Sequence, residues 1–287
     1  MSNQIVGSDM RNKPFGARLR AAMDTRGPLC VGIDPHQHLL DAWGLPDTAE
    51  GLASFTYGVV DALADRVAVF KPQSAFFERF GSAGIAVLEQ ATIRLREAGA
   101  LVIIDAKRGD IGTTMAGYAA AYLAEKGPLA CDALTVSPYL GADSLAPFVD
   151  AARAAGAGLF VLVRTSNPGA ADFLDADTGA GPLHERIARV VDGLADRLAG
   201  SGAFSGAGAV IGATEPRFLD RLRELMPRAI FLLPGVGAQG GSAAALGGAF
   251  AGPGSALVTA SRSIASAPDP AVAAEELRAQ VWSIAGG

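Results

Sequence analysis

The chain has 287 residues, of which 50% are hydrophobic and 18% are charged, and its formal net charge is −5. This length and composition are sufficient for one large α/β domain with a sizeable core. The mild negative charge excludes bulk attraction for nucleic acid or anionic lipid, so any phosphate must be bound by a local site. No apolar run approaches the ~20 residues of a membrane span, and we expect neither a nucleic-acid nor a membrane partner.

The N-terminal segment, the cysteines and the histidines further restrict which kind of protein this chain can be. Residues 1–13 are polar and are predicted to be a flexible leader, which leaves 14–287 as a single domain. Cys30 and Cys131 lie inside apolar runs, as small buried residues do in a reducing, cytoplasmic compartment. His36 and His38 are interpreted as loop residues because no further Cys or His completes a zinc set, and we expect no metal.

Apolar runs and amphipathic segments alternate along the whole chain. The runs predicted to be strands are Leu29–Pro35, Val67–Gln73, Leu101–Lys107, Ala133–Gly141, Gly158–Gly169, Gly208–Thr214, Ala229–Gly241 and Ala256–Ile264. The segments predicted to be helical are Pro14–Gly27, Ser54–Arg66, Gly84–Ala98, Thr113–Lys126, Asp143–Ala155, Leu183–Leu198, Glu215–Met226, Ser242–Phe250 and Asp269–Ile284. Roughly eight strands, each followed by a helix, predict a (β/α)8 TIM barrel, with a doubly wound open sheet as the alternative.

Polar residues follow the predicted strands consistently. They are Asp34, Lys71, Asp105, Lys107, Ser166, Gln239 and Arg262, each at or just beyond the C-terminal end of a strand. In a barrel that end carries the active site, whereas randomly scattered charges would not all occupy it. This placement is the strongest physical indication of a functional site.

The stretch Leu101–Tyr118 is the centre of the predicted site. Four apolar residues lead directly into Asp105, Lys107 and Asp110. Because strand side chains alternate between faces, Asp105 and Lys107 are expected to point the same way, with Asp110 in the turn before the next helix. Two carboxylates flanking an ammonium shift one another's pKa values, as catalytic groups often do. The alternative is an ordinary Asp105–Lys107 ion pair with Asp110 as a helix cap.

A phosphate site is predicted after the last two strands. The loop Gly235–Gly241 offers backbone N–H groups before a helix, and Arg262 adds a cation at the end of the next strand. Ser166 and Gln239 are suited to the polar edge of a heterocycle, although either is equally acceptable as a turn residue. No nucleotide-cofactor motif is present in the sequence. Glu78 and Arg79 are interpreted as a loop ion pair.

The same segments resemble orotidine 5′-monophosphate decarboxylase. Residues 105–111 match its DxKxxDI signature, and further blocks follow in the right order. These are GIDP at 32–35, the strand-end Lys71, TSNPGA at 165–170, PGVGAQGG at 234–241 and SRSI at 261–264. The resemblance covers about residues 29–264, and the FKPQSAFFERFG block is similar to the longer bacterial branch of the family.

The resemblance implies a cofactor-independent carboxy-lyase that converts orotidine 5′-monophosphate (OMP) to UMP and CO2 in de novo pyrimidine biosynthesis. It also implies a homodimer with shared active sites. In the catalytic group, Lys107 would protonate C6, Asp105 would lie beside the substrate carboxylate, and Lys71 would belong to the charge network. Asp110 would reach the partner's site. The implied substrate-binding residues are Asp34, Ile111, Thr114, Ser166, Pro234, Gln239, Ser261 and Arg262. Ser261 departs from the family pattern, since many members have Gly there.

Two alternatives remain open from the sequence. One is a Mg²⁺-dependent sugar-phosphate decarboxylase or aldolase of the same superfamily, which shares the Asp-x-Lys-x-x-Asp pattern. Those relatives have an acid at the preceding strand end, where this chain has Lys71, and a cation there disfavours a metal. The other is a non-catalytic barrel that binds a phosphorylated metabolite.

Overall fold

The computed structural model describes residues 13–198, 204–236, 241, 243–252 and 255–286. Eight parallel strands pair in chain order and close into a barrel, with β1 hydrogen-bonded to both β2 and β8. The strands are β1 (Leu29–Ile33), β2 (Val69–Pro72), β3 (Leu101–Arg108), β4 (Ala133–Val136), β5 (Gly158–Arg164), β6 (Ala207–Ile211), β7 (Ile230–Pro234) and β8 (Ala256–Ala260). The predicted (β/α)8 fold is therefore confirmed, and the open-sheet alternative is wrong.

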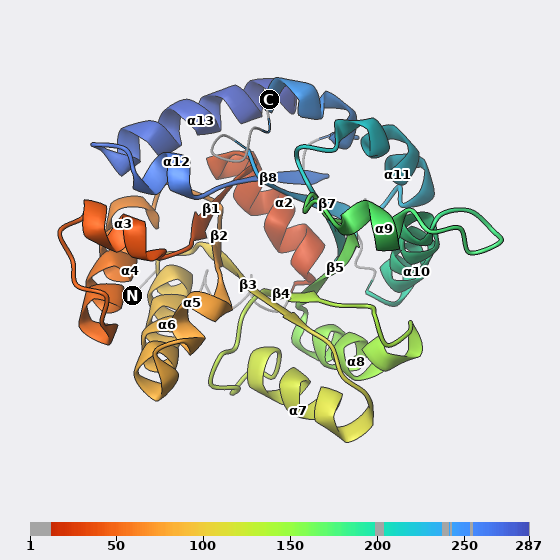
Figure 1. The fold of residues 1–287 in the computed structure, drawn as a ribbon, viewed down its shortest axis with the longest axis horizontal. Helices are drawn as coiled ribbons and strands as arrows, with labels where there is room; N and C mark the ends of the chain where they lie inside the picture. Colours follow the sequence, from red (N-terminus) through yellow and green to blue (C-terminus); the bar gives the residue numbers. More distant parts are fainter. Residues whose placement is uncertain (1–12, 199–203, 237–240, 242, 253–254, 287) are drawn as a thin grey trace.

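Helices surround the strands, as Figure 1 shows. The α-helices are α2 (Phe15–Arg26), α3 (Gln37–Ala42), α4 (Ala49–Leu63), α5 (Ser74–Glu78), α6 (Gly81–Glu97), α7 (Gly112–Tyr122), α8 (Ala146–Ala155), α9 (Ala170–Leu174), α10 (Leu183–Arg197), α11 (Leu219–Leu225), α12 (Arg262–Ala265) and α13 (Pro270–Ile284). Short 3-10 helices are η1 (Asp143–Leu145), η2 (Pro216–Phe218) and η3 (Ala243–Ala249). Most strand residues are buried on both faces, because the helices cover the outside and side chains fill the inside.

Several predicted helix boundaries differ from the structure for local reasons. The helix predicted from Ser54 begins at Ala49, because the side chain of Thr48 accepts a hydrogen bond from Gly51 N and caps it. The segment predicted as a helix over 242–250 is the 3-10 helix η3, whose sequence contains two adjacent glycines. The predicted helix 143–155 divides into η1 and α8, and a proline stands at the start of α8.

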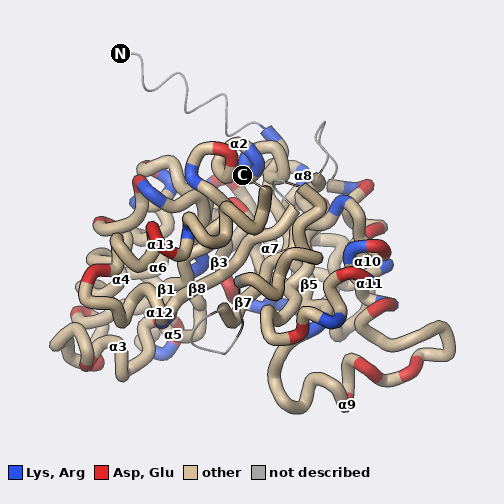
Figure 2. Tube along the Cα trace, turned by 90° about the horizontal axis from the view of Figure 1, so that it is seen from above, with Lys and Arg blue, Asp and Glu red and all other residues tan. Residues whose placement is uncertain are grey.

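Helix α2 closes the N-terminal end of the barrel and crosses its opening (Figure 1). Its residues Phe15, Leu19 and Met23 belong to the same buried cluster as the inward-facing strand residues. The ring of Phe15 meets that of Phe160 edge-on, with centroids 6.0 Å apart. In the view of Figure 2, α2 lies on the side opposite α3, α5 and α9. The C-terminal end of the barrel is therefore the end left open for a site.

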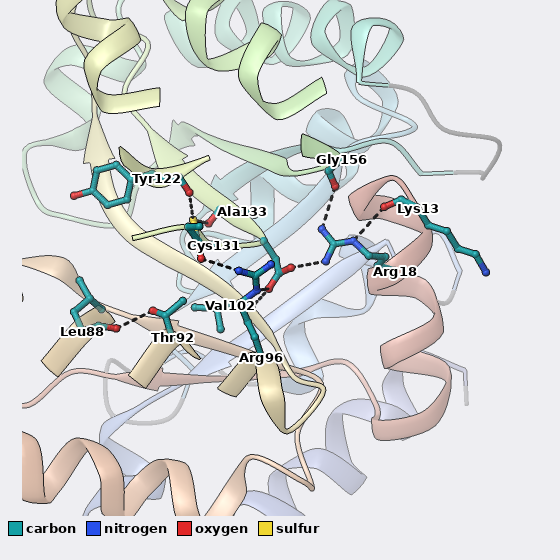
Figure 3. A network of polar contacts seen from close by, with 12 residues as sticks. Lys13, Arg18, Leu88, Thr92, Arg96, Val102, Tyr122, Cys131, Ala133 and Gly156 are labelled. Atoms are coloured by element: carbon teal, nitrogen blue, oxygen red, sulfur yellow. Dashed lines mark hydrogen bonds and ion pairs between the residues drawn. The ribbon is translucent and has the colours of Figure 1, made fainter. Parts of the chain in front are cut away.

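A buried ion-pair network fastens α2 to the strands at the closed, N-terminal end of the barrel (Figure 3). Arg18 on α2 pairs with Asp132, which precedes β4, and it also donates to the carbonyl of Gly156 at 3.1 Å. The other oxygen of Asp132 accepts the backbone N–H of Val102 at 2.9 Å and lies 3.7 Å from Arg96 Nε. The side chains of Arg18 and Asp132 are only 7% and 3% exposed. Water therefore does little to stabilise either charge, and the Arg18 guanidinium relies on the Asp132 carboxylate as its counter-ion.

We expect Asp132→Ala to lower the free energy of unfolding by about 3–5 kcal/mol, because it leaves the buried Arg18 guanidinium without a counter-ion. Chemical denaturation measures this directly. Asp196→Ala is the matched control, since it removes a carboxylate that is 75% exposed and paired with Arg228. That control should cost no more than about 1 kcal/mol. Equal losses in the two variants would contradict a stabilising role for the Arg18–Asp132 pair.

Candidate active site

A cavity of about 510 Å³ opens at the C-terminal ends of the strands. It is lined by eight residues that the sequence singled out, namely Asp34, Lys71, Asp105, Lys107, Ser166, Pro234, Ser261 and Arg262. Apolar side chains of β5, β6 and β7, namely Leu162, Val210 and Leu232, line one part of its wall. Gln239 and most of the predicted glycine-rich phosphate loop lie outside the described residues, so their roles stay predictions.

Three charged groups form a continuous chain within this cavity. Lys71 Nζ lies 2.9 Å from Asp105 Oδ2, and Lys107 Nζ lies 2.6 Å from Asp105 Oδ1. The Lys71 side chain is 5% exposed and the Asp105 side chain 10%, whereas Lys107 is 44% exposed. The carboxylate is thus held between a buried ammonium and one that reaches the open part of the cavity.

Burial and charge act in opposite directions on this cluster. Burial alone would raise the pKa of Asp105, but the ammonium groups of Lys71 and Lys107 hold that pKa well below its usual range. Burial alone would lower the pKa of Lys71, but the carboxylates of Asp105 and Asp34 raise it above its usual value. Asp105 is therefore a carboxylate and Lys71 an ammonium at neutral pH.

The end of β3 is not a regular strand. The pairing with β4 advances from Ile104 to Arg108 on β3 but only from Leu134 to Val136 on β4, so β3 bulges between these points. Within the bulge, Lys107 has φ 48° and is the one residue other than glycine with positive φ in the described part of the chain. Such a conformation costs of order 1–3 kcal/mol and is concentrated at functional sites.

Two glycines allow neighbouring serines to approach the strands closely. A Cβ added to Gly32 would lie 2.8 Å from Ser261 Cβ, and one added to Gly212 would lie 2.5 Å from Ser166 Cβ. Ser261, the departure from the family pattern, is therefore accommodated by the missing side chain of Gly32. Its Oγ is buried and, within the described residues, has no hydrogen-bond partner, and the same holds for Asp34 Oδ1. Buried polar atoms are rarely unpaired, so these two atoms are suited to contact a polar ligand.

The sequence analysis missed several residues that line the cavity. Gln73 Nε2 donates to Asp105 Oδ2 at 3.0 Å, and the hydroxyl of Thr135 contacts Asp105 Oδ1 at 2.8 Å. Thr259 and His36 also line it, and burial is the largest factor lowering the pKa of His36. Gln73, Thr135 and Thr259 all lie at the C-terminal ends of strands, and this position is the sequence feature that indicates a place in the cavity. Uncharged polar residues at strand ends are a weaker signal than charged ones, because they also occur there as ordinary turn residues.

Three predicted site residues do not line the cavity of their own chain. Asp110, Ile111 and Thr114 lie on the turn after β3 and at the start of α7. Ile111 is 62% exposed, and Thr114 is also exposed. Asp110 Oδ1 accepts the N–H of Ile111 at 2.8 Å, whereas helix α7 has no side-chain cap. The interpretation of Asp110 as a helix cap is therefore wrong.

The predicted Glu78–Arg79 ion pair is also wrong. Arg79 pairs with Asp47, and Glu78 pairs with Arg108 at the end of β3. The two residues are adjacent at the end of α5, so their side chains diverge on the helix surface and find partners elsewhere.

Comparisons with known proteins agree with this architecture. The sequence profile of the Orotidine 5'-phosphate decarboxylase / HUMPS family matches residues 27–277. The orotidine 5'-phosphate decarboxylase of Streptomyces coelicolor is 56% identical over 234 residues, which are 82% of this chain and 83% of that protein.

Two solved structures have the same fold over nearly the whole chain. A Streptomyces avermitilis protein assigned to the same enzyme has a TM-score of 0.87 and 48% identity, covering 96% of this chain and 97% of its own. Leishmania donovani OMP decarboxylase has a TM-score of 0.81 and 33% identity, covering 96% and 99%. With its closed barrel and its Lys–Asp–Lys cluster at the open end, this chain belongs to the orotidine 5'-phosphate decarboxylase family.

Proposed function

We propose that this chain decarboxylates OMP to UMP and CO2 without a cofactor, in pyrimidine nucleotide biosynthesis. The observation that carries the proposal is the buried Asp105 carboxylate clamped between two lysines, with the second lysine facing the cavity. A site that only binds a phosphorylated metabolite has no need for a carboxylate beside an anionic ligand. No described helix is long and apolar enough to cross a membrane. We also propose a cytoplasmic location, because Cys30 and Cys131 are free, buried thiols, as is usual in a reducing compartment.

The groups around the cavity match the parts of the substrate. Arg262 and the loop after β7 hold the phosphate, Asp34 and Lys71 hold the ribose hydroxyls, and Ser166 contacts the pyrimidine. Asp105 then lies beside the substrate carboxylate. The C6–carboxylate bond breaks, its electron pair stays on C6, and CO2 departs. The Lys107 ammonium stabilises this carbanion and donates its proton to C6.

Electrostatic repulsion contributes only part of the acceleration. Two carboxylates ~4 Å apart at an effective dielectric near 20 repel by about 4 kcal/mol. Enzymatic accelerations require roughly 8–23 kcal/mol. The remainder comes from the Lys107 ammonium and from phosphate and ribose contacts that are fully realised in the transition state.

We also propose a homodimer whose active sites are shared. Asp110, Ile111 and Thr114 do not line the cavity of their own chain, and Ile111 and Thr114 are exposed. Ile111 and, in the loop after β4, Tyr139 are 62% and 72% exposed. A subunit interface would cover such exposed apolar side chains, and two-fold dimers are the commonest oligomers. In this arrangement the three residues complete the partner's site.

The Mg²⁺-dependent alternative is disfavoured by Lys71. Its ammonium occupies one oxygen of Asp105, and Lys107 occupies the other, so a metal would have to displace both. Turnover of OMP with and without a chelator tests the reaction. We expect UMP and CO2 to form at the same rate in both. Loss of turnover with chelator would favour the metal-dependent relatives, and an absence of turnover in both would leave a binding protein.

Arg262→Ala is expected to lower kcat/KM for OMP by roughly 10-fold to 100-fold, the value of a charged hydrogen bond of about 1.5–3 kcal/mol. Part of the loss should appear in kcat, because remote binding energy is realised in the transition state. Steady-state kinetics with OMP and with orotidine, which lacks the phosphate, measures both effects.

Orotidine should be nearly indifferent to the Arg262 substitution. Arg153→Ala is the control, since its side chain is 69% exposed at the opposite end of the barrel, and it should leave kcat/KM unchanged. Equal losses with OMP and orotidine would mean that Arg262 acts on the fold and not on the phosphate.

A further inference from the structure

The bulge at the end of β3 leaves a backbone group that the strand ladder does not satisfy. Between Ile104 and Arg108 the regular pairing with β4 is interrupted, and the Lys107 N–H falls within this gap. That N–H donates to Thr135 Oγ1 at 2.9 Å, so a side chain of β4 replaces the missing backbone acceptor. The positive φ of Lys107 therefore coincides with a hydrogen bond to a hydroxyl on the neighbouring strand.

The direction of the hydrogen bonds at Thr135 is fixed by chemistry. A backbone N–H only donates, so Thr135 Oγ1 accepts from Lys107 and its own hydrogen is free for another partner. That partner is Asp105 Oδ1, 2.8 Å away, which is an acceptor because the carboxyl is ionised. Thr135 is itself only 1% exposed, so no bulk water competes for either bond.

Thr135 completes the set of donors around Asp105. Oδ1 accepts from Lys107 Nζ and from Thr135, and Oδ2 accepts from Lys71 Nζ and from Gln73 Nε2. With donors on both oxygens, the carboxylate is held against rotation. Of the three donor residues other than Lys107, Thr135 is the one with a hydrogen bond to the Lys107 backbone within the described residues, so it links the orientation of the acid to that of the lysine.

We propose that Thr135 is a positioning residue for the decarboxylation: its hydroxyl fixes the Asp105 carboxylate and holds Lys107 in the conformation that aims its ammonium at the reacting carbon. This inference rests on the proposed function. Thr135 acts through Asp105 and Lys107 and is not itself assigned a contact with the reacting atoms. The effect belongs to the chemical step, because phosphate and ribose are held by other residues.

The test compares Thr135→Val, Thr135→Ala and Thr135→Ser. The first two remove the hydroxyl, and measuring both means that the result does not depend on one variant folding. We expect kcat to fall by roughly 10-fold to 100-fold in each, as displacements of about 1 Å in a catalytic group do. Thr135→Ser keeps the hydroxyl and should retain kcat within about threefold. The Kd for UMP, which lacks the C6 carboxylate, should change less than about twofold in all three.

Thr92→Val is the matched control for losing a buried threonine hydroxyl. Thr92 is 3% exposed and donates to Leu88 O within α6, away from the cavity. It should lose stability without losing kcat. Gln73→Met removes a donor to Asp105 without touching the Lys107 backbone, so it should lower kcat less than Thr135→Val.

Two kinetic results would overturn the inference: kcat within threefold of wild type in Thr135→Val, or a fall in kcat matched by an equal weakening of UMP binding. A crystal structure of Thr135→Val provides a test that does not require turnover. We expect Lys107 to leave positive φ and its ammonium to move away from Asp105, and unchanged geometry would also overturn the inference. An unmodified protein that does not turn over OMP would instead refute the proposed function, and the crystallographic result would still decide the role of Thr135.

Discussion

Lys107→Ala should reduce the rate of OMP decarboxylation by roughly 10²–10⁴-fold, the usual contribution of a positioned general acid. No described group other than Lys107 and Lys71 brings an ammonium to the cavity, and Lys71 is buried against Asp105. The variant also loses the positive charge that stabilises the C6 carbanion, so the loss should lie at the upper end of that range. Release of CO2 from labelled OMP measures it over several orders of magnitude.

The fold and substrate binding should survive the Lys107 substitution. The lysine is 44% exposed, and its removal leaves no buried space to fill. Lys126→Ala, at an exposed lysine after α7, is the control and should keep full activity. If Lys107→Ala decarboxylates OMP at a near-normal rate, Lys107 cannot be the acid.

Mixing two inactive variants, Lys107→Ala and Asp110→Ala, should restore about a quarter of wild-type activity if sites are shared across a two-fold dimer. Random exchange makes half of the dimers mixed. Each mixed dimer has one site with both lesions and one site with Lys107 and Asp110 intact, each from its own subunit. Activity assays after subunit exchange, with mixed dimers counted by native mass spectrometry, give the fraction restored.

Each variant incubated alone provides the baseline for this experiment. If Lys107 and Asp110 served the same site from one chain, every site in a mixed dimer would keep one lesion. No recovery despite proven exchange would then contradict the shared site, and Asp110 would be a local residue of the turn after β3.

The sequence was sufficient for the barrel and for most of the cavity. Continuous apolar runs and amphipathic segments identify eight strand–helix units, and the rule that parallel strands end at one face brings Lys71, Asp105 and Lys107 together. Buried apolar strands and strand-end charges are strong signals because few other arrangements satisfy them.

The local irregularities were not predictable in the same way. The bulge in β3 and the positive φ of Lys107 depend on a neighbour from another strand, Thr135, whose contact is invisible in a linear pattern. Regular strand alternation predicts that Asp105 and Lys107 point the same way, and their side chains do contact each other. The alternation rule does not include the bulge and the positive φ at which Lys107 makes this contact. Likewise, Glu78 pairs with Arg108, thirty residues further along the chain, and not with the adjacent Arg79.

Helix α2, which closes the N-terminal end of the barrel, has a consequence for how the chain folds as it is synthesised on the ribosome. Helix α2 is the first described element to leave the ribosome, yet its ion-pair partner Asp132 and its ring partner Phe160 are made more than a hundred residues later. The cluster that it joins also includes Leu257 of the last strand. Contacts so distant in sequence form slowly, and long chains expose apolar surface until they form. We therefore expect the apolar face of α2 to remain uncovered by these partners during most of translation and its docking to be a late step in folding.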